Sequence, residues 1–247
     1  MPPQSFTHNK AQIFPRHRRP QRGAWLFEIS HRFFPPVADG FQALWGLDGP
    51  VANRLGLAYA VSDRAMVGVV RTNIDDNLEL NAKARLLDGG TESIPVMIGV
   101  KGGFAWNMSD PGESGAGDNE SQAYAQVILN ALIGDRLGVG LVPTVLRNPR
   151  IQDTEPETTF ALGVPGQAYI SEQVSLLGEW IISRRQPDLE HDSGTLGIEL
   201  ETGGHFFKIV LTNQYRMNPT QVLGGTPYQF KPKYWRLGFN VTRLLTF

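Results

Sequence analysis

The stretch that most constrains the fold is residues 234–247, because its side chains alternate in polarity almost without a break. Side chains on a β-strand point to opposite faces with period two, whereas helical spacing would scatter these residues around a cylinder. The stretch therefore predicts a strand with one apolar, largely aromatic face and one polar face that contains a glycine. The apolar positions, interrupted only by Arg243, are Trp235, Leu237, Phe239, Val241, Leu245 and Phe247.

Eleven further segments are predicted as strands from their alternation and from the turn residues between them. The clearest is 77–86, where polar residues interleave with leucine and alanine, and the least constrained is 65–73, which is apolar on both faces up to Arg71. With the terminal strand they make twelve, an even number as in single-chain bacterial barrels. The eleven are 23–34, 52–61, 65–73, 77–86, 94–107, 122–133, 137–147, 158–170, 174–184, 194–201 and 206–214.

The connections between these strands alternate between short and long, and only the link at 74–76 breaks the rule. Such alternation places all tight turns at one end, as in outer-membrane barrels with short periplasmic turns and longer external loops. We therefore predict an all-β fold for residues 23–247, a closed antiparallel up-and-down transmembrane β-barrel. The alternative is a soluble sandwich whose polar faces meet water. The tight connections are residues 62–64, 88–93, 134–136, 171–173 and 202–205.

Composition excludes several classes of function. The chain has no cysteine, so a disulfide framework, a thiol catalyst and a cysteine-ligated metal are impossible. Its formal net charge of -1 gives no indication of nucleic-acid binding. The chain has no run of about 18 apolar residues, so no membrane-spanning helix is predicted. This does not exclude a transmembrane barrel, because the strands of a barrel alternate and leave no such run. We expect no cofactor and no metal.

Residues 1–22 form a basic, proline-rich tail with five lysine or arginine residues and no acidic residue. The tail lacks the apolar core of a secretory signal, so we expect the export signal to be absent from this chain. It is predicted to be a flexible periplasmic segment. The alternative is an arm that binds an anionic partner or enters the barrel.

If the aromatic faces meet lipid, the opposite faces line the lumen, and eight bases and five acids are assigned to it. Charges in a narrow lumen must be paired or hydrated. They could form a mutually paired core that holds the barrel rigid, or a narrow water-filled path with a weak preference for anions. The assigned residues are Glu28, Arg32, Arg54, Arg71, Glu79, Lys83, Arg85, Lys101, Glu179, Glu199, Glu201, Lys208 and Arg236.

The loop at residues 35–50 is too irregular for a strand and too short to fold alone. Its apolar side chains Phe41, Leu44 and Trp45 need an apolar environment. Because loops folded into the lumen commonly plug such barrels, we expect this loop to fill the barrel mouth.

The chain is not expected to be an enzyme. His31 has Asn53 across from it on the outer wall, but no serine completes a hydrolase set there. Glu190, His191 and Asp192 lie together on an external loop and are interpreted as solvated rather than metal-binding.

A carboxy-terminal strand that ends in phenylalanine resembles the insertion signal of bacterial outer-membrane barrels, so Phe239 and Phe247 are assigned to recognition by the barrel-assembly machinery. The runs 31–33, 46–49, 54–59 and 62–69 resemble an uncharacterised family of outer-membrane β-barrel proteins, known only as a domain of unknown function. The resemblance covers most of the chain from about residue 24. It implies a barrel in the outer membrane of a Gram-negative bacterium, with the lipid bilayer as partner, and supplies no catalytic residue and no solute.

Two functions remain open. One is a narrow passive channel for small neutral or anionic solutes. The other is a closed structural barrel that anchors a partner protein, itself unidentified, through its loops or its basic tail.

Overall fold

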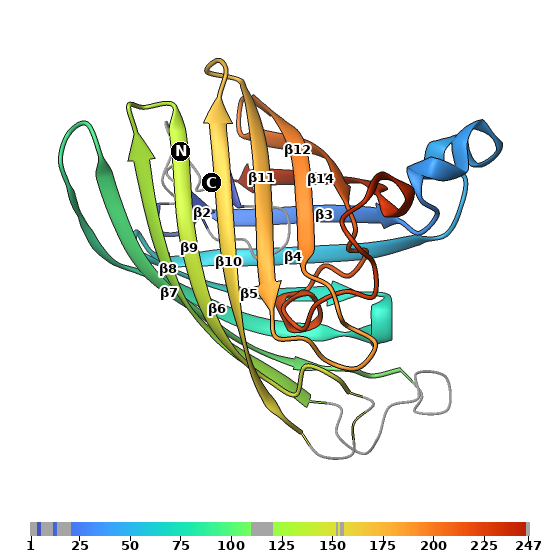
Figure 1. Ribbon diagram of the computed structural model, residues 1–247. Helices are drawn as coiled ribbons and strands as arrows, with labels where there is room; N and C mark the ends of the chain where they lie inside the picture. The colour runs from blue at the N-terminus through green and yellow to red at the C-terminus, as the bar shows by residue number, and fades with distance from the viewer. Residues whose placement is uncertain are drawn as a thin grey trace.

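Twelve antiparallel strands close into a barrel in the computed structural model, which describes residues 4–5, 12–13, 21–109, 121–151, 153 and 156–245. Each strand pairs with its neighbours in the sequence, and the last pairs with the first to close the ring (Figure 1). The predicted fold class and strand number are therefore confirmed. The strands are β3 (Trp25–Phe33), β4 (Val51–Ser62), β5 (Ala65–Thr72), β6 (Leu78–Gly90), β7 (Pro95–Trp106), β8 (Ser121–Ile133), β9 (Leu137–Arg147), β10 (Thr158–Tyr169), β11 (Val174–Ser183), β12 (Ser193–Thr202), β13 (His205–Thr212) and β14 (Arg236–Leu245).

Burial alternates along the strands as the sequence pattern requires. In β9, for example, Val142, Thr144 and Leu146 are buried while Leu141 and Val145 are exposed. The exposed set forms the outer wall and the buried set points into the ring. Every backbone edge is paired by closure, as lipid demands of a membrane-spanning sheet.

Strand register brings inward-facing residues from different strands to one level. Glu28 on β3 is opposite Gly56 on β4, which is opposite Val70 on β5, which is opposite Glu79 on β6. On the other side of β3, Ser30 is opposite Asn240 on β14. Side chains that are far apart in the sequence therefore meet inside the barrel.

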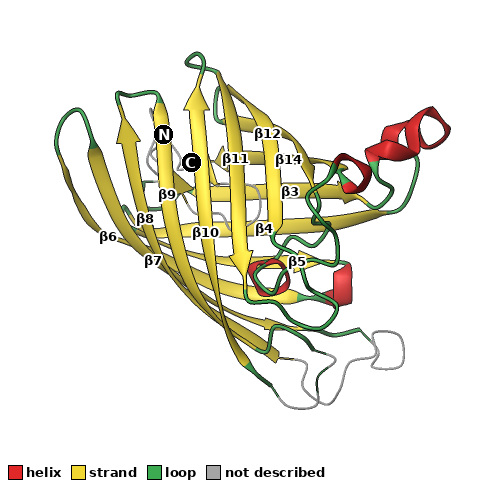
Figure 2. Ribbon diagram, viewed as in Figure 1, coloured by secondary structure: helices red, strands yellow, loops and turns green. Residues whose placement is uncertain are grey.

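The connections sort by length as predicted, with tight turns at one end and longer loops at the other. Within the described part of the chain, the short helices lie at the loop end: η1 (Val37–Gly46), η2 (Ile74–Asp76), α2 (Pro219–Val222) and η3 (Pro232–Tyr234). Figure 2 shows η1 set off to one side. All four residues of α2 are buried, and Val222 packs against inward-facing residues of the strands. Among the described residues, no helix is long and apolar enough to cross a membrane.

A small hairpin of β1 (Gln4–Ser5) and β2 (Gln12–Ile13) precedes the barrel, and β2 lies beside β8 and β9. The rest of the basic tail up to residue 20 lies outside the described residues, as do Thr246 and Phe247.

Candidate functional site

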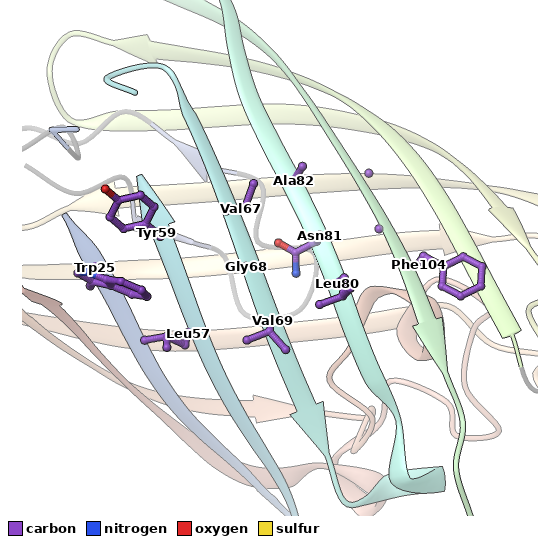
Figure 3. Close-up of a pocket in the computed structure, with 12 residues that line it drawn as sticks. Trp25, Leu57, Tyr59, Val67, Gly68, Val69, Leu80, Asn81, Ala82 and Phe104 are labelled. Atoms are coloured by element: carbon purple, nitrogen blue, oxygen red, sulfur yellow. The ribbon is translucent and has the colours of Figure 1, made fainter. Parts of the chain in front are cut away.

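The outer wall is an apolar surface. Leu57, Val69 and Leu80 lie side by side on β4, β5 and β6 and are exposed, Leu80 by 49% (Figure 3). Between Trp25 and Phe104 the wall is hollowed into a groove of about 850 Å³, whose lining includes glycines and Ala82. Exposed apolar surface on this scale marks contact with lipid or with another protein.

The inner wall is polar and charged. At its loop-side half, Arg54 on β4 forms an ion pair with Glu28 on β3, and both side chains are almost fully buried. Glu28 also accepts a hydrogen bond from the Ser30 hydroxyl at 2.7 Å. Removing either side chain of such a pair would leave the other as a buried charge without compensation.

Arg32 is fully buried and lies next to β14. Its Nη1 donates to Asn240 Oδ1 and to the His31 carbonyl, both at 2.7 Å. A Cβ on Gly238 would come within 2.5 Å of Arg32 Cδ, so only glycine leaves room for this guanidinium. This accounts for the glycine in the polar face of the terminal strand.

Glu79, on β6, is the next acid around the wall. Its Oε1 accepts hydrogen bonds from the Tyr124 hydroxyl at 2.9 Å and from Asn81 Nδ2 at 3.1 Å. Lys101 Nζ lies 5.2 Å from the centre of the Tyr124 ring and interacts electrostatically with Glu79 and with Glu179. Glu179, on β11, also interacts electrostatically with Arg32 on β3.

A second charged group lies on β12 and β13. Lys208 Nζ is 3.0 Å from Glu199 Oε2, and both side chains are buried. Gln167 Nε2 donates to Glu199 Oε1 at 2.9 Å, and the Ser175 hydroxyl lies at 3.3 Å. The acid is thus held by a base and by neutral donors from β10 and β11.

Three assigned bases remain, and two of them, Arg236 and Arg85, lie nearer the barrel ends. Arg236 Nε donates to the Phe34 carbonyl at 2.9 Å, and its guanidinium lies 3.9 Å from the centre of the Tyr228 ring, at the loop end. Arg85 is 3.5 Å from Asp88 and sits at a β-bulge between β6 and β7. Lys83 is opposite Lys101 on the neighbouring strand.

The assignment of Arg71 to the lumen was wrong. Its side chain is 48% exposed on the outer face of β5 and pairs with Asp76 at 2.9 Å. Val70 and Thr72 take the inward positions instead. Because β5 is apolar on both faces, its alternation could not decide which side Arg71 takes. The other twelve residues of the assigned set, seven bases and five acids, take inward positions in their strands, and all are buried except the partly exposed Lys83, Arg85 and Glu201.

The plug prediction was also wrong. Phe41 is 73% exposed, Trp45 50% and Leu44 45%, all on η1. The rings of Phe41 and Trp45 pack on each other 5.6 Å apart. The β3–β4 loop (residues 34–50) therefore lies outside the lumen.

A different segment occupies the loop end of the lumen. Residues 213–226, the plug segment, precede β14 and are buried except for the partly exposed Tyr215 and Arg216. Val222 and Leu223 are fully buried and pack with inward-facing residues of four strands. Those partners are Tyr124 of β8, Leu146 of β9, Ala161 of β10 and Ile181 of β11.

Polar contacts hold the other side of the plug segment. Asn218 Oδ1 accepts from Arg54 Nε at 2.8 Å, and Asn218 Nδ2 donates to Asn77 Oδ1. Gln221 Nε2 donates to the Ile74 carbonyl at 2.9 Å. The segment thus bridges opposite walls through side-chain contacts.

From alternation alone, residues 215–230 are interpreted as a long loop, although one local signal could have shown the helix within it. Asn218 followed by Pro219 is the cap-and-proline signature of a helix start, and α2 begins there. Nothing in that signature places the helix inside the barrel. Neutral lumen residues such as Tyr124 and Gln167 were also missed, because only charged residues were assigned.

No group of three or more histidine, aspartate or glutamate residues within the described part of the chain could hold a metal. His31 does lie opposite Asn53, and its ring packs 4.5 Å from that of Phe239 on the outer wall.

Residues 6–245 match the family described as a membrane bound beta barrel domain. The chain belongs to this family. Membership makes the barrel a membrane protein and assigns the apolar outer wall to the bilayer. No curated protein matches the sequence.

Several solved structures of outer-membrane barrels have the same fold as this chain. An outer membrane channel from Pseudomonas putida F1 is 12% identical, with a TM-score of 0.58 over 95% of this chain and 100% of its own. The KdgM porin is 8% identical, with a TM-score of 0.53 over 91% and 99%. The NanC porin is 8% identical, with a TM-score of 0.52 over 89% and 98%.

Proposed function

We propose that this barrel is a narrow passive channel of the outer membrane for small neutral or anionic solutes, closed at its loop end by the plug segment. The observation that carries the proposal is the inner wall, where charged and neutral polar side chains continue from the plug to the tight-turn half of the barrel. Seven inward bases face five assigned inward acids and Asp88, which leaves a small excess of positive charge and favours anions over cations.

The way in which the plug segment is attached favours a channel that can open over a permanently filled barrel. It is joined to the walls by hydrogen bonds that involve side chains and by one apolar cluster around Val222 and Leu223, and its helix α2 is only four residues long. Moving it would break these contacts and the backbone bridge between Thr226 and His191, but no pairing between the twelve strands of the barrel. Proteins of the same fold are named porins and an outer membrane channel, which supports this class of function without identifying a solute.

Planar-bilayer recording tests the proposal. The native protein should give small, brief openings, and a variant whose residues 214–226 are replaced by a Gly/Ser linker of equal length should give larger, sustained ones. The reversal potential in a salt gradient should favour the anion. A Lys83→Gln/Lys101→Gln variant in the linker background should reduce that preference, since both lysines lie on the inner wall.

A closed anchor barrel is the second candidate, and the buried ion pairs Arg54–Glu28 and Lys208–Glu199 favour it, because charges paired with each other on the inner wall do not need water in the lumen. It would bind a partner protein through its loops or its basic tail. Silence from both the native protein and the linker variant, each folded by circular dichroism and heat modifiability, would favour the anchor and reject the channel.

We further propose that the barrel-assembly machinery inserts the protein through its last strand. Phe239 lies on the outer face of β14, whereas Phe247 lies outside the described residues. A Phe247→Ser variant should be synthesised normally but yield less heat-modifiable protein in outer-membrane fractions. Normal yield would remove Phe247 from the assembly signal.

A further inference from the structure

The β3–β4 loop presents an apolar surface outside the barrel. Phe41, Trp45 and Leu47 are exposed by half or more, and residues 37–50 contain no charged residue except Asp39 and Asp48. With Leu44, which is 45% exposed, these make four large apolar side chains close together, and they would be costly to leave in water. They therefore need an apolar partner outside the lumen.

The backbone holds these side chains in place. Leu44 and Trp45 adopt left-handed conformations at φ of 45° and 53°, which costs about 1–2 kcal/mol per residue for L-amino acids. Gly46 follows at φ 93°, where a Cβ would come within 2.6 Å of the Pro35 carbonyl oxygen. The turn closes through hydrogen bonds from the Leu47 and Asp48 amides to the Leu44 and Ala43 carbonyls. The exposure of Phe41 and Trp45 is thus built into the fold.

The loop adjoins an aromatic band on the outer wall at the loop end. The Val37 amide donates to the Trp235 carbonyl at 2.7 Å, where η1 meets η3 and β14. From Trp235 the ring contacts continue to Phe230 and then to Trp180, each at 5.3 Å. In membrane proteins such bands lie at the boundary between headgroups and acyl chains.

We propose that residues 37–47 insert into the bilayer leaflet on the loop side, at the boundary between headgroups and acyl chains. The occupant of this apolar surface is lipid, because the loop continues the lipid-facing wall at the level of its aromatic band. The proposal depends on the membrane location of the barrel and not on its activity as a channel. The loop acts as a lateral anchor that fixes the depth and tilt of the barrel beside β3 and β14.

The absence of cysteine makes this testable by single-site spin labelling of the whole chain. A label at Phe41→Cys or Trp45→Cys is measured in phosphatidylethanolamine/phosphatidylglycerol vesicles for collisions with oxygen and with a water-soluble nickel chelate. Glu190→Cys on an exposed loop at the same end is the water control, and Leu80→Cys on the wall is the lipid control. All four variants must show the same heat modifiability as the native protein.

The expected result is a ratio of oxygen to nickel collisions several times that at residue 190, at a depth of about 5–10 Å. A ratio equal to that at residue 190 would overturn the proposal, since the loop would then stand in water. Spin–spin broadening that disappears on dilution with unlabelled protein would also overturn it, because a second copy would then cover the loop.

Discussion

Two loops at the same end of the barrel lie in the opposite environments from those that their compositions suggest: the apolar loop lies outside and the polar one inside. The β3–β4 loop carries Phe41, Leu44 and Trp45 and lies outside, with these side chains exposed. The plug segment carries Asn213, Gln214, Asn218, Thr220, Gln221 and Thr226, and all six are buried. In a soluble domain the first loop would be expected inside and the second outside.

The reason for these placements lies in the two environments of a membrane barrel. The inner wall offers partners such as Arg54 and Asn77 to the polar plug segment, and one apolar patch that accepts Val222 and Leu223. If the β3–β4 loop lay inside instead, its Trp and Phe side chains would cover charged wall residues without offering them a polar partner. Each charge buried in this way would cost several kcal/mol. An apolar loop is thus better placed against the membrane than inside the lumen.

The largest expected effect is at the wall residue that holds the plug segment. Arg54→Gln leaves Glu28 buried without its cation and should cost about 3–5 kcal/mol of unfolding free energy. Arg71→Gln on the outer face removes an exposed pair and should cost about 0.2–1 kcal/mol. Urea titration of the vesicle-inserted proteins measures both. Equal losses would contradict the placement of Arg54 inside and Arg71 outside.

A smaller difference separates two leucines, one from each loop. Leu223→Ala empties a fully buried site and should cost about 2–5 kcal/mol. Leu47→Ala should cost less than about 1 kcal/mol, because a half-exposed side chain leaves no cavity behind. The same urea titration compares them, and a larger loss for Leu47 would reverse the roles of the loops.

The smallest expected effect on stability comes from removing a side-chain amide, Asn218 in the plug segment or Gln42 in the β3–β4 loop. Asn218→Ala leaves Arg54 Nε and Asn77 Oδ1 without this partner and should cost about 1–3 kcal/mol. It should also lengthen channel openings in a planar bilayer, since the plug segment is held less firmly. Gln42→Ala, at an exposed position of η1, should change stability by no more than about 0.5 kcal/mol and leave the openings unaltered.

The sequence by itself determined the barrel. Alternation with period two is a local property of each strand, so Leu80 and Glu79 could be placed on opposite faces from their neighbours alone, and the membrane environment then sets Leu80 outward. The alternation of short and long connections then gave antiparallel order and closure. Where alternation is lost, as in β5 before Arg71, the same reasoning had no basis and the assignment was wrong.

Only the tertiary structure decided which loop fills the lumen. Asn218 meets a partner 141 positions away, and Val222 and Leu223 meet residues of four different strands. Which wall residues a loop meets depends on the strand register around the whole barrel, and no local sequence pattern contains that information. The sequence fixes what each side chain prefers as its surroundings, but the closed barrel determines where those surroundings are.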